Sequence, residues 1–90
     1  MANRRSLKRN INYICSDLFA ECIAASIYKE KVNNETRDAI LASILHVHSD
    51  FIRRISIVEP GMDAKKYFAV LIEDFNRHVS EIIDNIRNLG

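Results

Sequence analysis

The sequence contains few of the residues that interrupt helices. Its 90 residues include two glycines and one proline. Because glycine and proline are the strongest local breakers of regular structure, their scarcity favours long, uninterrupted helices. It also excludes the glycine-rich loops that bind phosphate groups in nucleotide-binding proteins.

Long hydrophobic runs are absent as well. The longest stretch without Asp, Glu, Lys or Arg covers 39–49, whereas a membrane-spanning helix needs about 20 apolar residues. A basic segment at the start precedes apolar residues in the manner of a secretory signal, but Asp17 and Glu21 interrupt that apolar region. We therefore expect a cytoplasmic protein without a membrane span.

The chain also lacks a large charge of either sign. Thirteen basic and 12 acidic residues give a net charge of +1, which provides no overall field that would attract nucleic acid or an anionic membrane. Arg4, Arg5, Lys8 and Arg9 form a local basic cluster that can contact phosphates. Aromatic residues for base stacking are not interleaved with them. Nucleic-acid binding through these residues is therefore an alternative rather than the main interpretation.

Two cysteines, Cys15 and Cys22, lie seven positions apart. On one helix their Cα atoms are roughly 10 Å apart along the axis, whereas a disulfide requires a separation below about 7 Å. We expect both to be reduced thiols packed in the core, as is usual in a reducing compartment.

Three segments repeat apolar residues at helical spacing, and no strand-like alternation competes with them. Ser6, the pair Asn33 and Asn34, and Asp63 are candidate N-caps, and Glu-Pro-Gly at 59–61 ends the second helix. The sequence predicts an all-α protein with three helices, over about 6–32, 35–57 and 63–89.

The three apolar stripes are wide enough for each helix to cover two neighbours. The stripe of the first helix is predicted to include Tyr28, and that of the second helix Leu45. Short connections make consecutive helices antiparallel. We therefore expect residues 1–90 to form a single domain, an up-down-up three-helix bundle of long helices. A chain this short buries a small fraction of its surface, so dimerisation is expected to complete the bundle.

The second half of the first helix is apolar nearly all round. Within "LFAECIAASIY", Ile23 and Ile27 point about 180° or more away from Ile14, while Ala20 and Ala24 are small enough for another helix to approach closely. We interpret Ala20, Ile23, Ala24 and Ile27 as the interface of a homodimer that pairs the first helices of two copies.

Four ionisable residues lie on or beside the apolar stripes: Glu21, His48, Asp74 and His78. Aligning the three helices at their turns places the two carboxylates at one level with the histidines on either side, roughly 9 Å apart along the axis. That separation disfavours a single metal site, and no Glu-x-x-His pair of the di-iron type is present. We predict a buried, hydrogen-bonded polar layer that fixes helix register, and no metal or other cofactor.

No serine or cysteine lies in a recognisable nucleophile motif. The sequence therefore predicts a non-enzymatic interaction module that self-associates through the first helix. A further protein partner, which the sequence does not identify, is compatible with this prediction. Two alternatives stay open: a nucleic-acid-binding protein that uses the basic cluster, and a metal-binding bundle that uses Glu21, Asp74 and the histidines.

Overall fold

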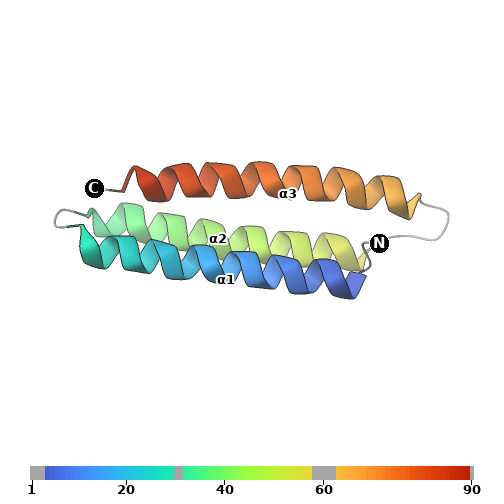
Figure 1. Ribbon diagram of the computed structural model, residues 1–90, viewed down its shortest axis with the longest axis horizontal. Helices are drawn as coiled ribbons and strands as arrows, with labels where there is room; N and C mark the ends of the chain where they lie inside the picture. Colours follow the sequence, from blue (N-terminus) through green and yellow to red (C-terminus); the bar gives the residue numbers. More distant parts are fainter. Residues whose placement is uncertain (1–3, 30–31, 58–62, 90) are drawn as a thin grey trace.

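The residues that the structure describes form three long helices (Figure 1). The structure is a computed structural model, and it describes residues 4–29, 32–57 and 63–89. The helices are α1 (Arg4–Tyr28), α2 (Asn34–Ser56) and α3 (Ala64–Arg87). The described ranges contain no strand, which confirms the all-α prediction.

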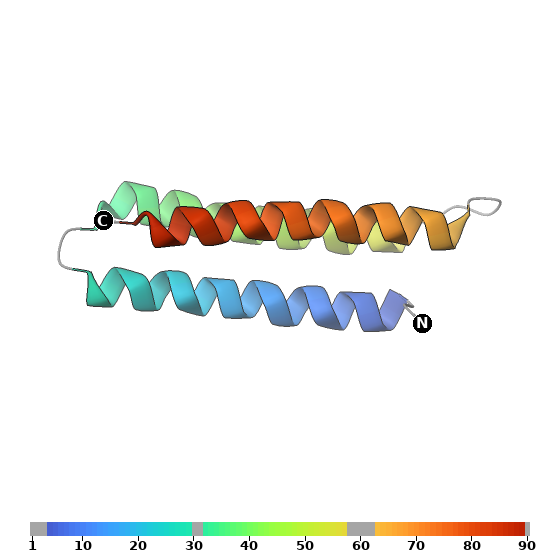
Figure 2. The same cartoon turned by 45° about the horizontal axis from the view of Figure 1, so that its top comes forward.

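The helices lie side by side and form a rod with principal extents of 52 × 16 × 16 Å (Figures 1 and 2). Lys29 Nζ, just after α1, donates a hydrogen bond of 3.0 Å to the backbone oxygen of Arg87 in α3. The carboxyl-terminal ends of α1 and α3 therefore lie at the same end of the rod. None of the described helices combines the length and apolar character that a membrane span requires.

Two of the three predicted N-caps are confirmed. Asn33 Oδ1 accepts hydrogen bonds from the backbone N–H of Glu35 (2.8 Å) and of Thr36 (3.3 Å). Asp63 Oδ1 accepts one from the backbone N–H of Lys66 at 3.2 Å. These bonds satisfy backbone donors that have no partner inside the helix, so both helix starts follow from local sequence.

The ends of α1 differ from the prediction. Ser6 lies inside the helix, which begins at Arg4, so its assignment as an N-cap is wrong. Arginine is a good helix former, and the helix extends through Arg4 and Arg5. At the other end α1 finishes at Tyr28, before the predicted end at 32. The predicted stop at 59–61 lies outside the described residues.

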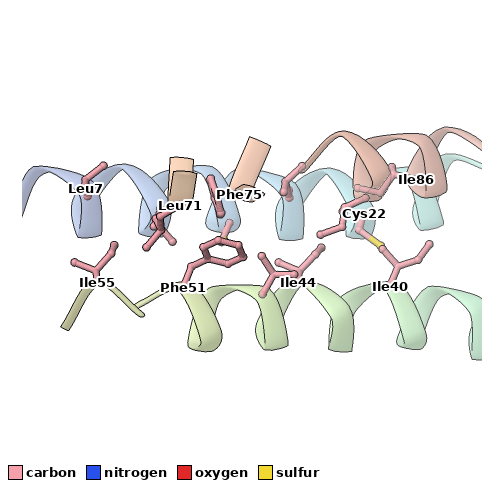
Figure 3. Packing of buried hydrophobic residues seen from close by; sticks show 14 of the residues in the cluster. Leu7, Cys22, Ile40, Ile44, Phe51, Ile55, Leu71, Phe75 and Ile86 are labelled. Carbon is pink, nitrogen blue, oxygen red and sulfur yellow. The ribbon is translucent and has the colours of Figure 1, made fainter. Parts of the chain in front are cut away.

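Side chains from all three helices form one hydrophobic core (Figure 3). Phe51 of α2 lies at its centre, with its ring edge-to-face against Phe75 of α3 at 5.2 Å between centroids. The largest fully buried side chains are Phe51, Ile44, Ile55, Leu71 and Cys22. Cys15 and Cys22 are free and buried, and burial raises the pKa of both thiols.

The buried face of α1 is rotated relative to the predicted stripe. It consists of Leu7, Ile11, Cys15, Leu18 and Cys22, and α1 packs most extensively on α2 and least on α3. Tyr28 lies six residues after Cys22, about 240° around the helix, and is 85% exposed. Leu45 is 58% exposed, because it lies about 100° from its buried neighbour Ile44. The prediction of both as core residues is therefore wrong.

Candidate interaction surface

The side of α1 opposite the core carries a second row of apolar and small side chains. We call this row the outer α1 surface, and it comprises Tyr13, Ser16, Ala20, Ile23, Ala24 and Ile27. Tyr13 is 76% exposed, Ile27 74% and Ile23 40%. Ala20 is also exposed, and Ala24 is half-buried. The four residues predicted as an interface therefore lie together on one side of the molecule, and Ile23 and Ile27 are not packed into the chain's own core.

The spacing within this row is that of a coiled-coil seam. Tyr13, Ser16, Ala20, Ile23 and Ile27 follow one another at alternating steps of three and four residues, which is the repeat that places side chains in a line facing a second helix. Sequence reasoning missed Tyr13 and Ser16 as members of this surface, although the alternating spacing from 13 to 27 is readable in the sequence.

A groove between α1 and α2 adjoins this surface. It has a volume of about 300 Å³ and is lined by Cys15, Ser16, Phe19, Ile44, Leu45 and His48. We call it the α1–α2 groove. A hydrogen bond between His48 Nε2 and Asn12 Oδ1 links the two helices at the same level. Since Ser16 belongs to both features, the groove and the outer α1 surface form one continuous, largely apolar area.

Asp74 forms the centre of a polar cluster between α2 and α3. Arg54 Nη1 donates to Asp74 Oδ2 at 2.8 Å, and Arg77 Nη2 donates to Asp74 Oδ1. The hydrogen bond from Arg54 lowers the pKa of the Asp74 carboxyl, assisted by Arg77 and partly opposed by desolvation. His78 Nε2 lies 3.9 Å from Asp74 Oδ1, which is too long for a hydrogen bond.

Arg54 joins several contacts in this cluster. Its backbone oxygen accepts a 2.8 Å hydrogen bond from the hydroxyl of Tyr67, and its guanidinium lies 4.5 Å from the centre of the Phe51 ring. Sequence reasoning missed Arg54 and Arg77. The i,i+3 spacing from Asp74 identifies Arg77, whereas the pairing with Arg54 depends on the register between α2 and α3.

The predicted buried polar layer is wrong. Among the residues that the structure describes, no polar or charged side chain is buried. Glu21 is exposed, because it lies about 100° around α1 from the buried Cys22. His48 and Asp74 are both half-buried, but His48 lies on α2 beside α1, whereas Asp74 lies on α3 beside α2. The ring of the partly exposed His78 packs edge-to-face against Phe51, with 5.7 Å between the ring centroids.

The basic cluster lies at the amino-terminal end of α1. Its four side chains and Asn12 line a hollow on the surface, and the first turn of α1 contains no acidic residue. This concentration of positive charge marks one end of the rod.

Within 4–29, 32–57 and 63–89, no group of three or more His, Cys, Asp or Glu side chains is arranged to hold a metal ion. Comparison with known proteins adds no assignment, since no protein-family model, curated protein sequence or solved structure matches this chain.

Proposed function

We propose that the protein is an up-down-up three-helix bundle that acts as a small, non-enzymatic homodimeric interaction module in the cytoplasm. Two copies pair through their outer α1 surfaces, and each covers the apolar side chains that the other exposes. Reduced, buried cysteines suit that compartment.

The observation that carries this proposal is that α1 is apolar on two opposite sides. Its inner side is buried in the core, and its outer side exposes Tyr13, Ile23 and Ile27 in a seam. Single exposed apolar residues are ordinary on protein surfaces, but a contiguous row of them marks an interaction site. A two-fold interface fits such a row, since it brings the same patch of both copies together.

The surface area that a stable dimer must bury indicates how far this interface extends. A helix of 25 residues is roughly 37 Å long and about 10 Å across, so α1 provides a contact strip of at most roughly 400 Å² even when its whole length is in contact. Stable interfaces bury about 800 Å² on each partner. The flanking α1–α2 groove therefore has to contribute, and its exposed Leu45 is the side chain best placed to do so.

Size-exclusion chromatography with light scattering tests the proposal. We expect the parent protein to be a dimer and the double variant Ile23→Glu, Ile27→Glu to be a monomer, because burying four carboxylates in a symmetric apolar interface is strongly unfavourable. Val70→Glu is the matched control, since Val70 is an exposed apolar residue on α3, 56% accessible and remote from the seam. Circular dichroism verifies that each variant is folded.

The outcomes are distinct. A monomeric parent protein, or a double variant that stays dimeric while folded, overturns the proposal. Leu45→Glu provides a graded result: because it lies on the flank, it should raise the dimer dissociation constant about tenfold rather than abolish pairing.

A further inference from the structure

Both the shape and the charge of the outer α1 surface are unequal along its length, and this inequality bears on how two copies align. In a coiled-coil seam the large and small side chains of one helix need complementary partners on the other. Ile23 and Ile27 are large and lie toward the carboxyl-terminal end, whereas Ser16 and Ala20 are small and lie nearer the amino-terminal end.

In a parallel pair every residue of the seam meets its own copy. Ile27 then faces Ile27, and Ala20 faces Ala20, so large side chains crowd at one level and small ones leave a gap at the next. In an antiparallel pair with the two-fold axis between 21 and 22, Ile23 faces Ala20 of the second copy and Ile27 faces Ser16. Ile23 and Ile27 then each meet a small side chain, and the part of the seam from 16 to 27 closes without a cavity.

Charge favours the same orientation. The basic cluster lies on the first turns of α1, and Arg5 and Arg9 belong to its outer side. A parallel pair juxtaposes these arginines from both copies, and like charges across an interface are costly. At the opposite end of the rod, where α1 ends and α2 begins, the charges are balanced: Lys29 and Arg37 are accompanied by Glu35 and Asp38.

We propose that the two copies pair antiparallel through α1, with Ile23 opposite Ala20 and Ile27 opposite Ser16 of the second copy, and with the basic end of each rod directed away from that of the other. This inference rests on the proposed homodimer. It adds the orientation and register of the contact, and it places the two basic clusters at opposite ends of the assembly.

Disulfide trapping in the full chain tests the orientation. In the antiparallel arrangement, equal numbers of Ser16→Cys and Ile27→Cys chains should form a mixed disulfide on mild oxidation, because positions 16 and 27 are level. Neither variant alone should cross-link, since each new thiol lies about 16 Å along the axis from its own copy, beyond the reach of a disulfide. The parent protein is the control, because its two thiols are buried.

These results separate the orientation from the homodimer itself. Disulfides between two Ile27→Cys chains, or no mixed disulfide in chains that light scattering shows to be dimeric, overturn the antiparallel register while leaving the homodimer in place. A monomeric parent protein overturns both.

Charge neutralisation gives a second readout that does not depend on a new thiol. Arg5→Gln with Arg9→Gln should leave the dimer dissociation constant nearly unchanged at low salt, because the antiparallel pair keeps the two basic clusters apart. In a parallel dimer the same change relieves repulsion and lowers the constant, so that result contradicts the proposal. Lys65→Gln with Lys66→Gln on α3 is the matched control.

Discussion

The two helices that pack on α2 differ in what they present to solvent. Both α1 and α3 bury one face in the common core. Beyond that face, α3 displays mostly charged residues, among them Glu73, Arg77 and Glu81, whereas α1 displays the outer α1 surface. Since the core alone accounts for one face of each helix, the second apolar face of α1 is the part of the sequence that folding of a single chain leaves unexplained.

The helices also differ in how they are attached to α2. On the α3 side, Arg54 pairs with Asp74 at 2.8 Å and accepts a hydrogen bond from Tyr67 through its backbone oxygen. On the α1 side, apolar packing predominates, with the bond between Asn12 and His48 beside it. The contact between α2 and α3 therefore combines apolar packing with an ion pair, whereas the contact between α1 and α2 is mainly apolar.

The largest predicted effect tests whether the inner faces are equivalent. Leu18 of α1 and Leu71 of α3 are both buried, at 4% and 1% exposure. Truncating each to alanine removes the same group from the core, so Leu18→Ala and Leu71→Ala should each lower the free energy of unfolding by about 3 kcal/mol. Urea unfolding followed by circular dichroism measures both.

These two variants test whether α1 and α3 contribute equally to the core. If Leu18→Ala costs less than about 1 kcal/mol while Leu71→Ala costs the expected amount, then α1 is not an integral part of the core. The inner face of α1 would in that case contribute little more than its outer face.

A smaller effect concerns the polar attachment of α3. Because Arg54 and Arg77 lower the pKa of Asp74 in the folded chain, the ion pair stabilises the fold at neutral pH. Its contribution is fully present above the unfolded pKa of about 3.9 and is lost as the pH falls through the lower folded value. Asp74→Asn should therefore lower the free energy of unfolding by about 1 kcal/mol at pH 6.

The pH dependence provides the control for that measurement. The difference between the parent protein and Asp74→Asn should shrink as the pH falls from about 5 to 2, because both then lack the charge. Glu73→Gln, an exposed neighbour on α3, should show little difference at any pH. A gap for Asp74→Asn that stays constant down to pH 2 contradicts a role for the ionised carboxylate.

Much of the fold was predictable because residues that are close in the sequence determine the helix starts and the buried faces. The caps at Asn33 and Asp63 follow from side chains that accept hydrogen bonds from nearby backbone N–H groups, and the buried spine of α2 follows from helical spacing. The exposure of Tyr28 and Leu45 was not predictable in this way. Both lie at the edge of an apolar stripe, where the rotation of one helix against another decides whether a side chain is covered.

The same distinction explains the outcome for the candidate sites. The residues predicted to form an interface were grouped by their positions on a single helix, which periodicity fixes, and they lie on one side of α1. The polar layer required three helices to align at one level with the correct rotation, and side-chain periodicity does not fix that alignment. Glu21 consequently lies in solvent, and Asp74 pairs with Arg54 rather than with a histidine.

The smallest predicted effect concerns His78 of α3. Its ring packs edge-to-face on Phe51, and its nitrogen stays 3.9 Å from Asp74, whose oxygens already accept bonds from two arginines. When an apolar side chain replaces the ring, Asp74 therefore keeps its hydrogen-bond donors and the contact with Phe51 is retained.

His78→Leu should accordingly change the free energy of unfolding by no more than about 0.5 kcal/mol, and the variant should fold normally in urea titrations. Its dimerisation should also be unaffected, since His78 lies between α2 and α3, away from the outer α1 surface. A loss above about 2 kcal/mol would mean that the imidazole stabilises α3 through its polar atoms. In that case the attachment of α3 would depend on His78 as well as on the pair between Arg54 and Asp74.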